Sequence, residues 1–295
     1  MLSVRVPPIV ESQRKAKAAY KDALHAGRGL SSFAITPLFC IKRCLLAMLP
    51  PIDMSYIADQ LVESGDEILR AFDESETPIE PNPRVILIGL ERLFDLIRAA
   101  EQDTLEESAR ALRDATGSEP AVLLDHGIAL LIQLAELARR LNLPPQARAL
   151  ERLTLPFCCW LLRRGGELSH PEPVINATAE LANSLREPDQ LVELFGLMRE
   201  IIDGIGLERA LESETTNPAR PWRVLLLNRA IVATRSHQPA LMEEAFADVV
   251  EHLPEDAPDF FREGIGQMEA RNYPAQVREV MQRYFDRWCT GQRLH

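Results

Sequence analysis

The sequence predicts an all-α protein, either an irregular helical-repeat array (α-solenoid-like, built of helix hairpins) or a multi-helical bundle. Two observations lead to this fold class. Proline follows a good N-cap residue at Thr36-Pro37 and Asn82-Pro83, and glycines such as Gly117 stand where helices should stop. Between these signals, apolar residues recur at helical spacing, and we find no convincing strand alternation bounded by turn residues.

We expect about a dozen helices, with ends uncertain by a few residues. Proline at position 156 should kink or break the helix that contains it. The expected ranges are roughly 11–26, 37–49, 54–73, 83–101, 104–116, 120–141, 145–164, 172–185, 188–203, 221–236, 239–252, 258–271 and 274–289.

The C-terminal third favours paired helices. Helix starts recur near Pro221, Pro239, Pro258 and Pro274, so alternate starts are 37 and 35 residues apart. This is the length of a helix-turn-helix repeat. It resembles tetratricopeptide or HEAT stacking in spacing alone, because the signature residues do not align, and it indicates no particular family.

Charge divides the chain. Up to Pro50 there are eight basic and two acidic residues, a net charge of about +6. Because the whole chain carries −11, the remainder carries about −17. We therefore predict a basic N-terminal helical module over residues 1–75 and an acidic, repeat-like body over 83–295. The acidic stretches 73–82 and 212–220 are rich in Ser, Thr and Pro and should be linkers, the second of them a sub-boundary within the body.

The basic module supplies the candidate partner-binding residues, which are Arg14, Lys15, Lys17 and Lys21. These cations, interspersed with alanines, suit phosphate, anionic lipid or an acidic protein partner. Equally, they could neutralise the acidic body of the same chain. The apolar side of this helix is mostly alanine, which is poor for membrane insertion.

Composition narrows the classes of function. A net charge of −11 argues against nucleic-acid binding over the whole surface, since phosphate needs a basic face. The start MLSVRVPP does not read as a signal peptide, and five cysteines suit free thiols in a reducing cytoplasm. The stretch Phe33–Leu49 is too short and too charged to span a membrane, so we predict no transmembrane segment. Arginine replaces lysine beyond residue 42, which suggests a bacterial, GC-rich source.

Four of the cysteines could form a zinc site, but we favour the interpretation that they pack in the core. Cys40 and Cys44 share a helix face, and Cys158 and Cys159 are adjacent, so four thiolates could hold zinc. However, CxxC spacing is missing, and all four lie in strongly apolar helices where cysteine packs as a small hydrophobe. We expect no metal and no cofactor.

Three carboxylate–histidine pairs are weak catalytic candidates. Glu167-Leu-Ser-His170 lies between glycines and a proline and should be a loop. In Asp125-His126 and Glu251-His252, adjacent helical residues point about 100° apart and form no dyad. We find no nucleophile elbow, phosphate loop, dinucleotide fingerprint or zinc-protease motif, so we predict no catalytic residues.

The sequence favours a non-enzymatic scaffold, adaptor or assembly factor that binds another protein through helical surfaces. Aromatic residues concentrate near the C-terminus, and at helical spacing they are more often core than interface. The alternative is a helical enzyme or small-ligand regulator with a pocket between helices, around Asp125, His126 and the Cys158-Cys159 segment. A nucleic-acid regulator acting through the basic N-terminus is the least favoured, and the oligomeric state is left open.

Overall fold

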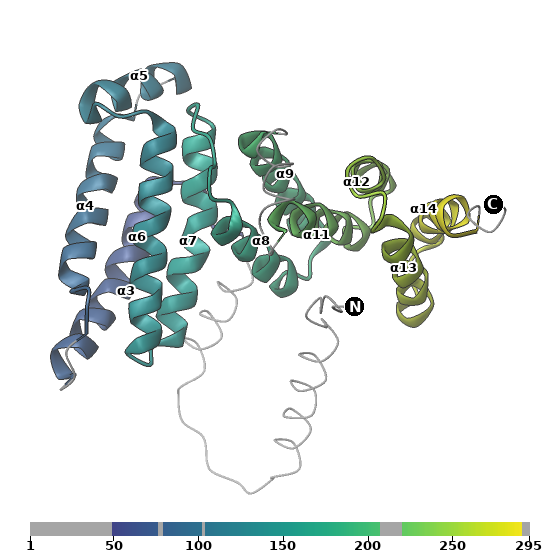
Figure 1. The fold of residues 1–295 in the computed structure, drawn as a ribbon, viewed down its shortest axis with the longest axis horizontal. Coiled ribbons are helices and arrows are strands. Elements are labelled where there is room, and N and C mark those ends of the chain that lie inside the picture. Colours follow the sequence, from purple (N-terminus) through teal and green to yellow (C-terminus); the bar gives the residue numbers. More distant parts are fainter. Residues whose placement is uncertain (1–48, 76–78, 102–103, 207–219, 291–295) are drawn as a thin grey trace, which may run out of the picture. The chain divides into compact units, whose positions relative to one another are not determined.

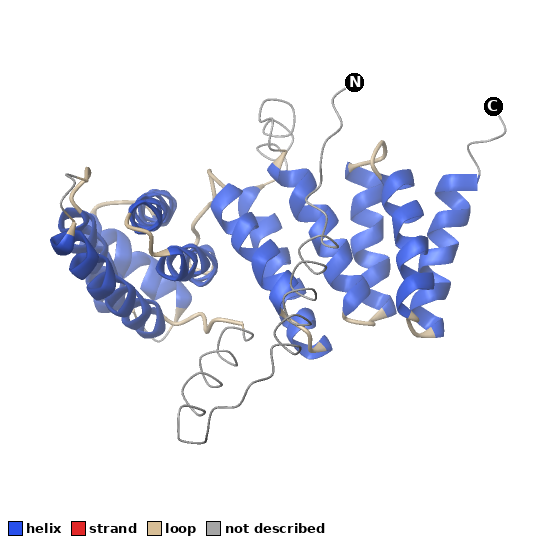
Figure 2. Cartoon of the chain, turned by 90° about the horizontal axis from the view of Figure 1, so that it is seen from below, coloured by secondary structure: helices blue, strands red, loops and turns tan. Residues whose placement is uncertain are grey.

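The structure, a computed structural model, describes residues 49–75, 79–101, 104–206 and 220–290. Of these residues, 81% are helical and none is in a strand, which confirms the all-α prediction (Figures 1 and 2). The helices are α3 (Met54–Glu74), α4 (Pro83–Ala99), α5 (Leu105–Thr116), α6 (Pro120–Arg140), α7 (Pro144–Leu162), α8 (Glu172–Ser184), α9 (Pro188–Ile205), α11 (Pro221–Arg235), α12 (Pro239–His252), α13 (Ala257–Arg271) and α14 (Ala275–Phe285), with a π turn η1 (Asp286–Thr290).

Local sequence sets the helix ends. The Asn82 side chain accepts a hydrogen bond from the Arg84 amide at 2.9 Å, as expected of an N-cap residue. Thr104 caps α5, because its hydroxyl accepts from the Glu107 amide and donates to the Glu107 carboxylate. Gly117 ends α5 in the left-handed conformation at φ 66°, which glycine adopts without a Cβ penalty.

Helices α3, α4, α6 and α7 form a four-helix bundle, in which each helix packs on two of the others (Figure 1). Helices α6 and α7 lie close together at Gly127. A Cβ at this position would lie 2.4 Å from ring atoms of Phe157, so a larger residue would require this ring to shift. The absence of a side chain at Gly127 therefore lets α6 pack closely on α7.

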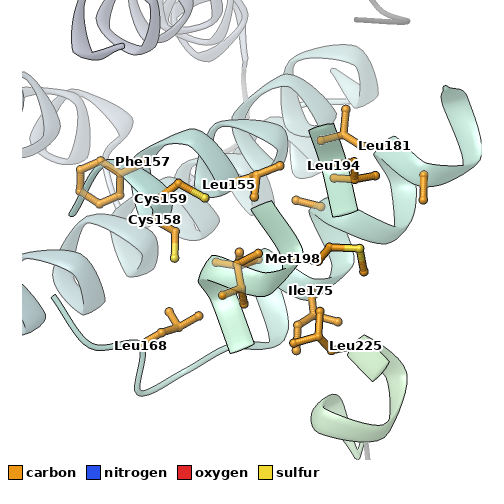
Figure 3. Packing of buried hydrophobic residues seen from close by; sticks show 14 of the residues in the cluster. Leu155, Phe157, Cys158, Cys159, Leu168, Ile175, Leu181, Leu194, Met198 and Leu225 are labelled. Carbon is orange, nitrogen blue, oxygen red and sulfur yellow. The ribbon is translucent and has the colours of Figure 1, made fainter. Parts of the chain in front are cut away.

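Helix α7 is shared between the bundle and the helices that follow, because it also packs on α8 and α9. Every residue from Leu153 to Leu161 is buried, Pro156 among them, and Figure 3 shows part of this interior. Pro156 does not divide the helix, which runs from Pro144 to Leu162 as one element. The expected break is therefore absent, and α7 joins the two halves of the core.

Beyond α7 the helices pack in succession rather than in a ring. Helix α11 packs on α8, α9 and α12, and α14 packs on α12 and α13. The rings of Phe246, Phe260, Phe261 and Tyr284 contact one another edge-on or tilted, with centroids 5.2–5.7 Å apart. Phe246 and Phe261 are buried core residues, as predicted for aromatic residues at helical spacing, and the partly buried Phe260 and Tyr284 pack against them. The helix starts near 221, 239, 258 and 274 agree with the prediction within a residue, although a structural repeat is not established.

The expected module boundary at residue 75 needs correction. Helix α3 packs on α4 and α7, and its buried Met54, Ile57 and Leu61 belong to the same apolar core. The compact unit begins at Leu49, so residues 49–75 are part of the body. Residues 1–48 lie outside the described part, where a basic helical module stays a prediction. The helices on either side of the proposed sub-boundary, α9 and α11, pack against each other.

One described helix, α6, is long and apolar enough to cross a membrane on length and composition alone. About half of its most apolar stretch is buried inside the bundle against neighbouring helices. The core helix of a bundle meets the same criterion, so this is weak support for a span.

Candidate functional site

The outer face of α4 carries three of the six large apolar side chains that the described residues leave exposed. Val85, Ile88 and Leu96 expose 68%, 47% and 43% of their surface. Their spacing, with Arg92 between the last two, is i, i+3, i+7 and i+11, which places all four side chains on one helical face. We call these four residues the α4 stripe.

The α4 stripe is not a by-product of core formation. The opposite side of the helix already supplies seven buried residues to the bundle: Pro83, Ile86, Leu87, Leu90, Leu93, Phe94 and Ile97. Three further large apolar side chains stay exposed in the described part of the chain, Val62 on α3, Leu105 on α5 and Val122 on α6. All six therefore lie on α3–α6, and three of them share one face of α4.

Arg92 gives the α4 stripe a positive charge at its centre. The side chain is exposed and forms no hydrogen bond or ion pair with any described residue. The neighbouring Asp95 is paired with Arg98 at 2.5 Å instead. The stripe thus combines apolar contact area with one cation that is not committed to a described carboxylate.

The candidate residues Arg14, Lys15, Lys17 and Lys21 lie outside the described residues, as do Cys40 and Cys44. Their proposed roles remain predictions. No cluster of three or more His, Cys, Asp or Glu side chains that could hold a metal occurs among the residues that the structure describes.

Cys158 and Cys159 are free thiols with no exposed surface (Figure 3). Burial, followed by the nearby Glu200 carboxylate, raises the pKa of Cys159 to about 12. Burial also raises the pKa of Cys158 well above its usual value. Both thiols are therefore protonated at neutral pH, and neither is suited to act as a nucleophile or a metal ligand.

The structure pairs two candidates that the sequence had placed in different motifs. His170 Nδ1 lies 3.7 Å from Asp125 Oδ1, and the Ser169 amide donates to the same oxygen at 3.4 Å. These contacts tie the α7–α8 loop to α6. His170 is 78% exposed, and the Glu167 side chain is exposed as well. This is a surface contact that positions a loop.

In the other two pairs, the histidine and the adjacent carboxylate have different surroundings, as expected from their adjacent positions on a helix. His126 is exposed, whereas Asp125 is partly buried. His252 stacks edge-on against Trp222 with centroids 6.1 Å apart, while Glu251 is exposed.

Sequence reasoning missed a buried arginine network between α9, α11 and α12. Arg229 is 2% exposed, donates to Glu244 and Asp248, and lies over the ring of Phe195 at 4.0 Å. Burial raises the pKa of Asp248, and Arg229 opposes that shift. The one available signal was a lone cation within the apolar run VLLLNRAIVA.

A second buried arginine lies directly after the end of α7. Arg164 lies over the Trp160 ring at 3.4 Å, donates to the Trp160 carbonyl and approaches Glu101 at 3.5 Å. Burial lowers the pKa of Arg164, and the Glu101 carboxylate opposes this shift. Like Arg229, Arg164 is a buried cation, and its carboxylate partner Glu101 is half exposed.

No protein-family model, curated protein or solved structure matches this chain.

Proposed function

We propose that the protein is a non-enzymatic helical scaffold or adaptor that binds another protein over the α4 stripe. The observation that carries the proposal is the exposure of Val85, Ile88 and Leu96 on one helix face. Single exposed apolar residues are ordinary on protein surfaces, but an aligned set on one helix is typical of an interaction site.

The occupant that fits this surface is an amphipathic helix with an apolar stripe and an acidic residue opposite Arg92. Helices recognise such faces through side chains at i, i+3, i+4 and i+7, which matches the spacing of the α4 stripe. An uncommitted cation inside an apolar contact favours a carboxylate on the partner and disfavours a second arginine. The partner that we propose is therefore an acidic helical segment of a different protein.

The N-terminal residues Arg14, Lys15, Lys17 and Lys21 fit the same kind of partner. Four cations on a helix would attract an acidic protein over a distance set by ionic strength. We propose that they accelerate the encounter, while the α4 stripe supplies the apolar contact.

The enzyme or small-ligand alternative has less support. It placed a pocket around Asp125, His126 and the Cys158-Cys159 segment. Those thiols are protonated and buried, and the Asp125–His170 contact lies at an exposed loop. We therefore do not propose a reaction for this region.

Site-specific photo-cross-linking in the native host tests the proposal. A photoreactive phenylalanine analogue in place of Ile88 should cross-link to a segment of another protein that forms an amphipathic helix with acidic residues. Substitution of Val85 and Leu96 by serine should abolish the cross-link, because it removes the apolar contacts on both sides.

Val62 provides the matched control, because it is equally apolar and exposed but lies on α3. The analogue placed at position 62 instead of 88 should not cross-link to this partner. Val62→Ser in the protein labelled at position 88 should leave the cross-link from position 88 unchanged. A cross-link between two copies of this chain, equal labelling from both positions, or no cross-link at all would each overturn the proposal.

A further inference from the structure

Helices α4 and α6 lie side by side in the bundle (Figure 1). Two close approaches show how they align. A Cβ at Gly89 of α4 would lie 3.5 Å from Leu130 of α6, and a Cβ at Gly127 of α6 would lie 3.1 Å from Leu93 of α4. The residue number rises along α4 where it falls along α6, so the two helices are antiparallel.

This alignment places the α4 stripe beside a row of residues on α6. Gly89, which approaches α6, follows Val85 of the stripe by one helical turn, so the stripe borders α6. On α6, the side chains at i, i+4 and i+8 are Val122, His126 and Leu130, which therefore share the face that meets Gly89. Val122 is 59% exposed, His126 is exposed and Leu130 is partly buried.

We call the α4 stripe together with these three residues of α6 the α4–α6 surface. Four of the six large apolar side chains that the described residues leave exposed lie on it. Counted from the close approaches, Val122 is level with Leu96 and His126 is level with Arg92. The α4–α6 surface is therefore apolar at both ends, with an arginine and a histidine in the middle.

The two central side chains are both available to a partner. Like Arg92, His126 forms no hydrogen bond or ion pair with any residue that the structure describes. The neighbouring Asp125 is engaged by the α7–α8 loop instead. On α4, Asp95 is paired with Arg98. A carboxylate from outside would thus meet two hydrogen-bond donors at the centre of an apolar surface.

We propose that α4 and α6 together bind one partner helix whose contact face reads apolar, acidic, apolar at intervals of three or four residues. The central carboxylate accepts hydrogen bonds from Arg92 and His126, and the apolar residues pack on the two ends of the α4–α6 surface. A helix with apolar residues alone would cover the two donors without an acceptor, which costs binding free energy and excludes ordinary amphipathic helices. The proposal depends on the proposed function of the α4 stripe and extends its site onto α6.

Cross-linking from α6 tests this arrangement. The photoreactive phenylalanine analogue in place of Val122 should capture, in the native host, the same partner segment as the analogue at position 88. The level of Val122 is about eight residues, or about 12 Å, from Ile88 along α4. Mass spectrometry should therefore locate the two cross-linked residues about eight positions apart on the partner helix, with an acidic residue between them. The analogue at position 62 on α3 should not capture this segment.

The central contact is tested by His126→Glu in the protein labelled at position 88. A second carboxylate facing that of the partner should lower the cross-linking yield at least about fivefold. The matched control is Asn176→Glu, which makes the same change at an exposed residue of α8 and should leave the yield unchanged. Both substitutions are at exposed positions, so the melting temperature should stay close to that of the parent.

The outcomes separate this inference from the proposed function. If position 88 captures a partner that position 122 does not, or if His126→Glu labels as strongly as the control, the partner does not lie across α6 and only this inference fails. An apolar or basic residue midway between the two cross-linked residues would also overturn it. If neither position captures a partner, the proposed function fails together with the inference.

Discussion

The bundle of α3, α4, α6 and α7 differs from the succession of helices α8 to α14 in the apolar side chains that it leaves exposed. Five of the six exposed large apolar side chains in the described residues lie on helices of the bundle, and the sixth, Leu105, lies on α5, which packs on α4 and α6. In the second region, an arginine that is 2% exposed is held between two carboxylates in the interior. Both regions bury an arginine, since Arg164 after the end of α7 is 8% exposed, but among the described residues only the bundle and α5 leave large apolar side chains exposed.

This difference indicates which half is suited to bind a partner. A ring of four helices completes its core with the inward faces alone, so the outer face of α4 is not needed for folding. Between α9, α11 and α12, the long Arg229 side chain and its carboxylate partners fill part of the space. The apolar surface on α4 is therefore available for a function, whereas the charges of α11 and α12 are structural.

The largest expected effect comes from removing the buried arginine. Arg229→Met leaves Glu244 and Asp248 without their buried cation and should lower the free energy of unfolding by about 3 kcal/mol. The effect should stay near the lower end of the range for buried pairs, because both carboxylates are about one-third exposed. Urea denaturation followed by circular dichroism measures it.

The matched control for this variant is Arg262→Met, since Arg262 pairs with Asp259 on the surface of α13. The loss there should not exceed about 0.5 kcal/mol. Equal losses in the two variants would show that the interior charge of the second region contributes no more than a surface ion pair.

A substitution at Gly127 tests the close packing of α6 on α7 in the bundle. The Gly127→Ala variant places a methyl group 2.4 Å from the ring of Phe157 and should destabilise the protein by about 1–3 kcal/mol through overpacking. Gly196→Ala on α9 meets no atom within 4 Å and should instead stabilise by up to about 1 kcal/mol through helix propensity. If both variants shift the urea midpoint in the same direction, the close α6–α7 contact is not a constraint.

The buried thiols make stability depend on alkaline pH. Burial places the pKa of Cys159 at about 12 in the folded protein, against an ordinary value of 9.0. Between these values the unfolded chain has lost the proton that the folded chain keeps. The free energy of unfolding therefore falls as pH rises, by about 1.4 kcal/mol per pH unit for each such thiol. Melting curves between pH 9 and 11 should show a shallower decline for Cys158→Ala/Cys159→Ala, and parallel declines would disprove buried, protonated thiols.

The smallest effect on stability is expected at the N-terminus. Reversal of Arg14, Lys15, Lys17 and Lys21 to glutamate should leave the melting temperature close to that of the parent, since exposed charges contribute about 0–1 kcal/mol each. The same variant should associate with the partner more slowly. Added salt should lower the association rate of the wild-type protein towards that of the variant. Unfolding or aggregation of the variant would place this helix in the core instead.

Much of the fold could be predicted from the sequence, because caps, stops and apolar period are local properties. Asn82, Gly117 and the starts of α11 to α14 are examples. Helix α3 was assigned to the wrong unit because the boundary was placed at the Ser-, Thr- and Pro-rich stretch 73–82, whereas the compact unit begins at Leu49, close to the change of charge at Pro50. The helix expected over 188–203 extends to Ile205, so Gly204 lies in the last turn of α9, where a Cβ would meet Leu162 at 2.5 Å.

The candidate sites were harder to predict, because they depend on contacts between distant helices. The pairing of Asp125 with His170 and the burial of Arg229 both join residues on different elements. The α4 stripe was hidden for a simpler reason. Val85, Ile88 and Leu96 lie in an almost continuous apolar run, and the sequence does not show which of its residues face outward.

The most direct test of the account is a charge exchange across the α4 stripe. The partner helix identified from position 88 is made as a peptide, and its dissociation constant is measured against the purified protein. Arg92→Glu should weaken binding at least about tenfold, and replacing the facing acidic residue of the peptide by arginine should restore most of it. If Arg92→Glu binds the original peptide as tightly as the wild-type protein does, or if the exchange restores nothing, the α4 stripe is not the partner-binding surface.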